Sequence, residues 1–264
     1  MSNSSTHRAR KRFGQNFLTD LAVVQSIINA IAPTSNDHIV EIGPGLGVMT
    51  QAILPLVKYL DAVELDRDLV TKLTGTMLPL GNFTIHSADA LKFDFCSLAK
   101  HSLKLRVVGN LPYNISTPLI FHLLQQLECI ADMHFMLQKE VVNRLAASPG
   151  TGSYGRLSVM VQYYCYVEKL FDVSPAAFSP APKVDSSVVR MIPHKQPPVH
   201  IEDLDNFQKI VRAAFAQRRK TLRNNLKSLL DEQQIQSLSI DPGRRGETLS
   251  IEEFAALSNL YTED

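Results

Sequence analysis

Residues 38 to 47 read His-Ile-Val-Glu-Ile-Gly-Pro-Gly-Leu-Gly, and this stretch decides the fold of the chain. The apolar run from His38 to Ile42 predicts a buried strand. The glycines that follow predict a tight loop, after which residues 48–55 have the pattern of a helix. Parallel α/β sheets are built from units in which a strand, a tight turn and a helix follow one another. We therefore predict a parallel sheet around this stretch.

The alternation of strands and helices continues on both sides. A helix is predicted over residues 20–32, with Asp20 as its N-cap and Pro33 after its end. Residues 157–166 fit a helix or a strand equally well. Further strands are predicted over 59–65, 83–86, 105–109, 133–138, 168–173 and 184–192, and further helices over 69–78, 117–127 and 140–147. The alternation predicts the α/β class.

The C-terminal part of the chain has a different pattern. Residues 193–198 are rich in proline, which is typical of a linker. One amphipathic basic helix is predicted over residues 203–230, and a capping box at Ser250 to Glu253 predicts the start of a last helix. The predicted domains are a mobile basic arm over residues 1–12, a sheet domain over 13–195 and a small α-helical domain over 196–264.

The composition excludes several classes of protein. Hydrophobic residues make up 45% and charged residues 20% of the 264 residues, which are globular values. The cysteines Cys96, Cys129 and Cys165 are far apart and form no Cys-x-x-Cys pair, so we expect reduced thiols and no zinc site. The histidines lack metal-ligand spacing. We find no secretory signal and no membrane span, and we expect a cytoplasmic protein.

The formal net charge of +1 conceals an uneven distribution. Every charged residue between positions 206 and 230 is basic: Lys209, Arg212, Arg218, Arg219, Lys220, Arg223 and Lys227. A local positive field on a nearly neutral protein indicates a polyanionic partner. A solvated helix face has the same pattern, so the charges alone leave both interpretations open.

Polar or flexible residues follow three predicted strands at their carboxyl ends, where open α/β sheets bind ligands. The loop from Gly43 to Gly47 lets a ligand approach the backbone. Glu64, about 20 residues further on, is placed to accept hydrogen bonds from ribose hydroxyls. Asp89 ends the next strand, and its carboxylate can accept from an adenine amino group. These features favour a nucleoside-containing cofactor.

The glycine spacing argues against one such cofactor. The third glycine comes one residue too early for the dinucleotide fingerprint, so a nicotinamide oxidoreductase is disfavoured.

A fourth strand, over residues 105–109, leads into Asn110-Leu111-Pro112-Tyr113. An amide, a rigid proline and an aromatic ring are therefore expected together at the ligand-binding edge of the sheet. The same residue types are also common in ordinary strand-to-helix turns, so this motif alone does not identify a site.

The order of these motifs resembles that of S-adenosylmethionine-dependent methyltransferases, and NLPY resembles the motif of amino-methyltransferases that act on nucleic-acid bases. Three further stretches extend the resemblance over nearly the whole chain, to the small-subunit ribosomal RNA adenine N6,N6-dimethyltransferase family. The stretches are KRFGQNFL at 11–18, FSPAPKVDS at 178–186 and AFAQRRKTLRNNL at 214–226.

This resemblance implies a Rossmann-like methyltransferase domain followed by a helical RNA-binding domain. It implies S-adenosylmethionine as cofactor, S-adenosylhomocysteine as product and no metal. The implied reaction is methyl transfer to N6 of two adjacent adenosines in a loop near the 3′ end of 16S ribosomal RNA, within an immature small subunit, with a role in its maturation. We expect a monomer. The implied cofactor residues are Asn16, Leu18, Gly43, Gly45, Glu64, Asp89 and Asn110.

The resemblance also implies roles in the transfer itself. We expect the Asn110 side-chain oxygen and the Leu111 carbonyl to accept hydrogen bonds from the adenine amino group, with Pro112 as part of the same motif. Tyr113 is expected to stack on the base and Phe178 to close its opposite side. The residues implied in RNA binding are Arg218, Arg219, Lys220 and Arg223.

Two other functions remain as alternatives. One is a large-subunit ribosomal RNA adenine dimethyltransferase that confers antibiotic resistance. The other is a non-catalytic RNA-binding factor in ribosome assembly that retains the fold.

Overall fold

The computed structural model describes residues 15–99 and 103–261, so the predicted arm over residues 1–12 lies outside the described residues. The chain forms two compact units. One contains the described residues up to Val142 together with Glu168–Pro193, and the other contains Asn143–Val167 together with the described residues from His194 onward. The predicted domain limits at 195 and 196 stay a prediction, and the segment 143–167 groups with the C-terminal helices.

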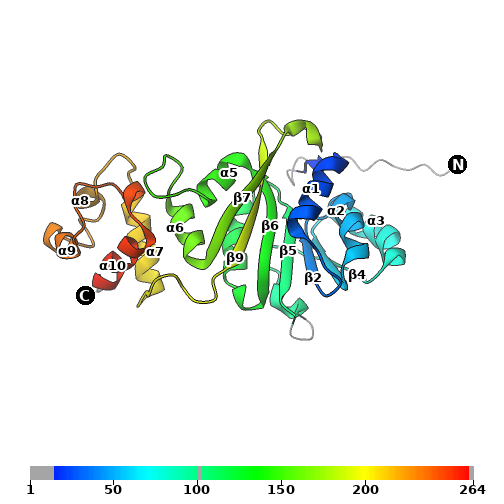
Figure 1. Ribbon diagram of the computed structural model, residues 1–264, viewed down its shortest axis with the longest axis horizontal. Coiled ribbons are helices and arrows are strands. Elements are labelled where there is room, and N and C mark those ends of the chain that lie inside the picture. The colour runs from blue at the N-terminus through cyan, green and yellow to red at the C-terminus, as the bar shows by residue number, and fades with distance from the viewer. Residues whose placement is uncertain (1–14, 100–102, 262–264) are drawn as a thin grey trace. The chain divides into compact units, whose positions relative to one another are not determined.

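The first unit is organised around a seven-stranded sheet with the order β4-β3-β2-β5-β6-β9-β7 (Figure 1). Neighbouring strands from β4 to β6 are parallel, and β9 is antiparallel to β6. The strands are β2 His38–Ile42, β3 Tyr59–Glu64, β4 Phe83–Ser87, β5 Leu105–Asn110, β6 Ile130–Gln138, β7 Cys165–Val173 and β9 Ser186–Pro193. The order reverses direction between β2 and β5, and such a switch point is where open α/β sheets bind ligands. The predicted parallel-rich α/β sheet is confirmed.

The helices of this unit follow the predicted alternation. Their bounds are α1 Leu21–Ile31, α2 Val48–Ile53, α3 Arg67–Met77 and α4 Ser116–Leu124. Helix α5, Lys139–Leu145, begins in this unit and ends in the other. The Asp20 carboxylate accepts hydrogen bonds from the backbone N–H groups of Ala22 and Val23, as predicted for an N-cap. All of β2 is buried, as in parallel sheets that are covered on both faces.

Gly109 sets the distance between the two strands that flank the switch point. A Cβ atom at this position of β5 would lie 2.6 Å from the backbone oxygen of Ile42 in β2. Since that neighbour is a backbone atom in a buried strand, a larger residue would force the strands apart. The absence of a side chain at Gly109 therefore keeps the ends of β2 and β5 close together.

The second unit is helical, and residues 157–166 contribute a helix to it. Its helices are α6 Arg156–Tyr164, α7 Leu204–Ala214, α8 Leu222–Asn225, α9 Glu232–Ser237 and α10 Ile251–Leu260. Ser250 and Glu253 form the predicted capping box at the start of α10. Tyr163 of α6 packs on Phe207 of α7 with 5.3 Å between ring centroids, which explains why residues 143–167 belong to this unit.

The prediction of one helix over residues 203–230 is wrong. The chain leaves the helix after Ala214 and resumes helical structure only at Leu222. The Asn225 side-chain amide donates hydrogen bonds to the carbonyl oxygens of Ala214, at 2.8 Å, and Gln217, at 3.1 Å. These bonds satisfy carbonyl groups that would otherwise accept from the next helical turn, so the chain can fold back without a glycine or proline.

The prediction that the cysteines are all reduced is also wrong. Cys96 and Cys129 form a disulfide, and Cys165 is a buried free thiol. Two short turns, Phe95–Leu98 and Leu127–Cys129, bring the pair together. The Gln126 side chain holds the turns in place, since its oxygen accepts from the Phe95 N–H at 2.7 Å.

In the part of the chain that the structure describes, no helix is long and apolar enough to span a membrane.

Candidate functional site

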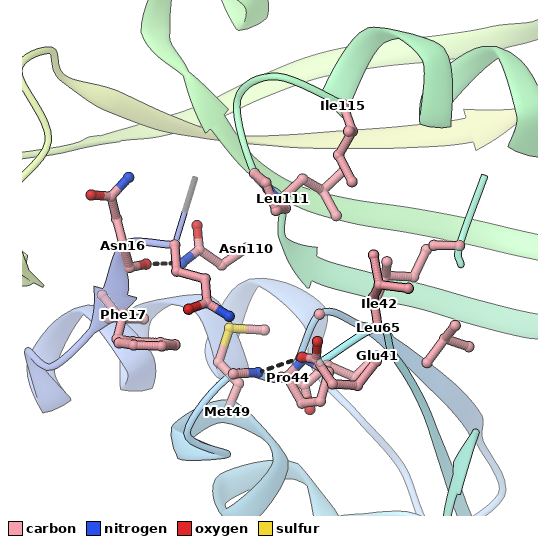
Figure 2. Close-up of a pocket in the computed structure, with 18 of the residues that line it drawn as sticks. Asn16, Phe17, Glu41, Ile42, Pro44, Met49, Leu65, Asn110, Leu111 and Ile115 are labelled. Carbon is pink, nitrogen blue, oxygen red and sulfur yellow. Dashed lines mark hydrogen bonds between the residues drawn. The ribbon is translucent and has the colours of Figure 1, made fainter. Parts of the chain in front are cut away.

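A cavity of about 300 Å³ opens at the carboxyl ends of β2, β3, β4 and β5 (Figure 2). It lies at the switch point of the sheet, where the sequence motifs predicted a ligand. Ten predicted site residues line it: Asn16, Leu18, Gly43, Gly45, Glu64, Asp89, Asn110, Leu111, Pro112 and Tyr113. Residues from five separate stretches of sequence therefore meet at one cavity.

Phe178 is the one predicted residue of the first unit that does not line the cavity. Its side chain is 5% exposed. It lies in the short strand β8, Phe178–Ser179, which pairs antiparallel with β1, Phe17–Leu18, so that Phe178 is opposite Leu18. In this structure Phe178 belongs to the same buried hydrophobic core as Leu18, and its predicted contact with a base stays a prediction.

The glycine loop forms one side of the cavity. Gly45 has a φ angle of +60°, in the left-handed region that favours glycine, and a Cβ atom there would lie 3.0 Å from the Phe17 ring. The Gly45 N–H points toward Glu64 and donates to its Oε2 atom at 3.4 Å. The loop is thus tied to the end of the neighbouring strand.

Glu64 ends β3 and is largely buried, with 7% of its surface exposed. Its Oε1 atom accepts from the Asp66 N–H at 2.8 Å, while Oε2 accepts from Gly45. Burial raises the pKa of Glu64, although these backbone hydrogen bonds oppose the rise. Each carboxylate oxygen has two acceptor positions, so Glu64 can accept further hydrogen bonds from a pair of hydroxyl groups.

Asp89 lies after β4 on the same edge of the sheet. Its Oδ1 atom accepts from the Leu91 N–H at 3.0 Å, which holds the carboxylate in place. Among residues 15–99 and 103–261, no donor bonds its Oδ2 atom. The half-buried carboxylate therefore retains an oxygen that can accept from an amino group of a ligand.

Asn110 has a fixed orientation at the end of β5. Its side-chain nitrogen lies 3.0 Å from the backbone oxygen of Asn16, and Figure 2 shows this bond as a dashed line. A carbonyl oxygen can only accept, so the atom that faces it must be the NH₂ group of the amide. The side-chain oxygen is consequently the free end, and no donor in the described part of the chain bonds it.

The next residues continue from this anchored amide. The Leu111 N–H donates to the Met136 oxygen of β6 at 3.1 Å, and the Leu111 side chain is buried. Its carbonyl oxygen accepts no hydrogen bond from the described residues. The Tyr113 hydroxyl lies 2.8 Å from the hydroxyl of Ser186 in β9. Asn110 and Leu111 thus offer two acceptor oxygens next to an oriented aromatic ring.

Sequence reasoning missed the apolar part of the wall, which includes Leu65, Ala90, Met49 and Ile115. Leu65 directly follows β3 and is 51% exposed. Figure 2 shows its side chain at the cavity. Their position in the sequence could have indicated two of these residues, because Leu65 directly follows Glu64 and Ala90 directly follows Asp89.

Glu41 is a buried acid on the wall, 2% exposed, whose Oε2 atom accepts from the Thr50 hydroxyl at 2.6 Å. Burial raises the pKa of Glu41 from 4.5 to about 7. Between these two pH values the folded chain retains a proton that the unfolded chain has lost. Glu41 therefore lowers the stability of the fold progressively as pH rises through this window, and the full loss persists above it.

Replacing Glu41 by glutamine should remove this pH dependence. The amide cannot ionise, and its oxygen can still accept from Thr50. Without bound cofactor, we expect E41Q to exceed the wild type in free energy of unfolding by about 3 kcal/mol at pH 8 and to match it near pH 4. Urea unfolding at both pH values measures the difference. An equal difference at both pH values would contradict the assignment.

The four predicted RNA-binding residues all lie in the second unit and are exposed. Arg218, Arg219 and Lys220 occupy the turn between α7 and α8 rather than one continuous helix, and Arg223 lies in α8. Arg218 pairs with Glu247 at 3.1 Å, and Arg223 pairs with Glu232 at 2.8 Å. Arg219 and Lys220 form no ion pair with any residue that the structure describes.

We also searched the described residues for side chains that could bind a metal ion. Within residues 15–99 and 103–261, no group of three or more His, Cys, Asp or Glu side chains is arranged to hold a metal ion. The polar groups that line the cavity include the carboxyl groups of Glu41, Glu64 and Asp89, the Asn110 amide and the Tyr113 side chain.

Comparison with known proteins identifies the family. The model of the ribosomal RNA adenine dimethylase family matches residues 6–263. The chain belongs to this family. A relative from Marinomonas sp. (strain MWYL1), named ribosomal RNA small subunit methyltransferase A, is 56% identical over 259 residues, which are 98% of this chain and 97% of that protein. A protein of the same name from Pseudomonas aeruginosa (strain PAO1) is 54% identical over 263 residues, or 100% and 98% of the two chains.

Solved structures agree with this membership of the ribosomal RNA adenine dimethylase family. A dimethyladenosine transferase from Plasmodium falciparum is 27% identical, with a TM-score of 0.76 over 91% of this chain and 95% of that one. The 23S rRNA methyltransferase ErmE shares the fold, with a TM-score of 0.73 at 21% identity, over 93% and 99% of the two chains. The predicted family and the Rossmann-like methyltransferase fold are confirmed, and the chain is an enzyme of the adenine dimethylase family.

Proposed function

We propose that this enzyme transfers methyl groups from S-adenosylmethionine to N6 of two adjacent adenosines near the 3′ end of small-subunit ribosomal RNA, giving N6,N6-dimethyladenosine. The observation that carries the proposal is the orientation of Asn110, whose NH₂ group is bonded to Asn16 and whose oxygen is left as an acceptor. The substrate is proposed to be an immature small subunit, and the protein a cytoplasmic monomer with a role in subunit maturation.

The donor and acceptor groups of the cavity fit S-adenosylmethionine. Glu64 would accept from the ribose hydroxyls, and the remaining oxygen of Asp89 would accept from the adenine amino group. Leu65 and Ala90 would contact the adenine ring, while Asn16, Leu18 and the loop at Gly43 and Gly45 would complete the pocket. When bound, this cofactor supplies an electrophilic methyl group attached to a sulfonium.

The residues that follow β5 would act on the substrate amine. The N6 lone pair of adenine is delocalised into the ring, so the amine is a weak nucleophile. Hydrogen bonds from its two hydrogens to Asn110 Oδ1 and the Leu111 carbonyl would localise that lone pair and stabilise positive charge on N6. Stacking on Tyr113 would hold the flipped base, and such stacking is worth about 1–3 kcal/mol.

The alternatives are less well supported. Relatives named for the small subunit are 56% and 54% identical to this chain over nearly its whole length. The 23S rRNA methyltransferase ErmE, at 21% identity, gives evidence about fold alone. A non-catalytic assembly factor would have no need of an oriented acceptor such as Asn110 beside a cavity lined by Glu64 and Asp89.

The deciding experiment offers methyl-labelled S-adenosylmethionine with three substrates: naked 16S ribosomal RNA, immature small subunits and large subunits. We expect label in the small-subunit particles, at two adjacent adenosines, as N6,N6-dimethyladenosine. Label in the large subunit alone would reassign the substrate. Label in none of the three, with retained RNA binding, would support the assembly factor instead.

The structure also sharpens the prediction for RNA binding. Because Arg218 and Arg223 are paired with acids, we expect Arg219 and Lys220 to contribute most of the contact with phosphates. In the R219A/K220A variant, the slope of log affinity against log salt should become shallower by about 1.5. Filter binding over a salt series measures this slope. The matched control is R67A/K72A, which removes two exposed charges from α3, and a similar change there would contradict the assignment.

A further inference from the structure

The Tyr113 ring is held by a residue of a distant strand. Its hydroxyl lies 2.8 Å from the Ser186 hydroxyl, across 73 positions of sequence. Ser186 is the first residue of β9 and is fully buried, whereas Tyr113 is half-buried at the cavity. Burial raises the pKa of Tyr113, so its hydroxyl stays protonated at neutral pH. No step of the proposed chemistry uses this hydrogen bond.

Ser186 is a rigid partner for the ring. It pairs with Gln138 in the antiparallel ladder between β6 and β9. The residue before it is also fixed, since the Asp185 oxygen accepts from the Lys139 N–H at 3.0 Å. In the described part of the chain, the Ser186 hydroxyl has no side-chain partner other than Tyr113. A buried hydroxyl that loses its partner cannot turn to bulk water, so the pair is favoured over alternative rotamers.

The backbone end of Tyr113 is fixed as well. The Ile115 N–H donates to the Pro112 oxygen at 3.2 Å, and the Ser116 hydroxyl donates to the Tyr113 oxygen at 3.3 Å. A tyrosine ring that is anchored at its backbone and at its hydroxyl has little freedom in either side-chain torsion. The direction of the ring plane is therefore set jointly by the loop after β5 and by β9.

We propose that Ser186 is a positioning residue, which sets the Tyr113 ring for stacking on the adenine and matters most for the second methyl transfer. This inference rests on the proposed function. An unmodified amine offers two hydrogens to Asn110 and Leu111, whereas a monomethylated amine offers one. The orientation of the base then depends more on stacking, so a loosened ring should harm the second transfer more than the first.

The test measures the rate constants of the two transfers separately, k1 for the first and k2 for the second, on the same adenosine under single-turnover conditions. In the S186A variant we expect k1 to fall by less than about 3-fold and k2 by about 10-fold, the size expected from one lost hydrogen bond. A simple loss of folded enzyme lowers both rates together and leaves k2/k1 unchanged. The ratio therefore separates positioning from stability.

Three further variants complete the design. Y113F removes the same hydrogen bond from its other end at a half-buried position, and it should lower k2/k1 as S186A does. The double variant S186A/Y113F should be no worse than either single variant, because both changes break one bond. S186T retains the hydroxyl and should restore the ratio.

The neighbouring serine provides a matched control. Ser187 is equally buried in β9, but its hydroxyl donates to Asp172 at 2.6 Å. S187A should therefore leave k2/k1 at the wild-type value. Thermal unfolding of every variant reports any loss of folded protein.

The experiment distinguishes a failure of the role proposed for Ser186 from a failure of the proposed function. A wild-type protein without methyl transfer on any RNA would overturn the proposed function itself. A wild-type protein that transfers both methyl groups, with k2/k1 unchanged in both S186A and Y113F, would overturn the role of Ser186 alone. Additive effects of the two substitutions would also overturn it, because they would show that the residues act separately.

Discussion

Replacing Asn110 by alanine is expected to slow methyl transfer by about 1000-fold, the loss seen when one strong transition-state hydrogen bond is removed from a preorganised site. The reason is the position of its side-chain oxygen, which faces the cavity because the NH₂ group is bonded to Asn16. The same substitution removes the bond to Asn16 and so should weaken cofactor binding without abolishing it. Single-turnover transfer and calorimetric titration of S-adenosylmethionine measure the two effects.

Two further variants accompany N110A. N110D retains an acceptor oxygen but loses the NH₂ group that bonds the Asn16 carbonyl, so we expect it to be impaired because its orientation is lost. N29A removes an exposed amide from α1 and should transfer methyl groups at the wild-type rate. Turnover by N110A within about 10-fold of the wild type would refute the acceptor role of Asn110.

Replacing Glu64 by alanine is expected to raise the Kd for S-adenosylmethionine by at least about 100-fold, because two hydrogen bonds to a charged group are lost, each worth about 1.5–3 kcal/mol. The ribose is remote from the methyl group that is transferred. Its contacts therefore contribute about equally to the bound ground state and the transition state. At saturating cofactor, kcat should stay within about 5-fold of the wild-type value.

The control variant for E64A must show that the loss of a negative charge elsewhere does not weaken cofactor binding. D68N removes one exposed carboxylate from the first turn of α3, close in sequence to Glu64, and should leave the Kd unchanged. E64A also leaves the N–H groups of Gly45 and Asp66 without their acceptor, so the thermal midpoint of each variant should be recorded. A reduced kcat with an unchanged Kd would assign Glu64 a role in the chemistry instead.

The sheet and most of the cavity were predictable because their signals are local. Buried parallel strands are continuous apolar runs, and residues at their carboxyl ends must meet at one edge of the sheet. Glu64, Asp89 and Asn110 could therefore be assigned to one site from sequence. The order of the motifs along the chain indicated the family, which no single motif would have done.

The features that sequence reasoning missed depend on contacts between distant residues. The end of α7 is stabilised by the side chain of Asn225, which a periodicity pattern does not register. The disulfide joins Cys96 to Cys129, whose separation of 33 residues gave no sign that two short turns would meet. Phe178 lies opposite Leu18 in a short ladder and is buried, and this long-range pairing has no local signal in the sequence.

The hydrogen bond between Asn110 and Asn16 joins two segments of the chain that differ in local stability. Asn110 ends β5, a buried strand that is paired on both sides with β2 and β6. Asn16 precedes β1, a ladder of two residues that pairs only with β8. A central strand opens at a free energy close to that of global unfolding, whereas so short a ladder opens at a much smaller one. We therefore expect any local opening of the cavity to begin on its β1 side, while the acceptor groups beside β5 stay in place.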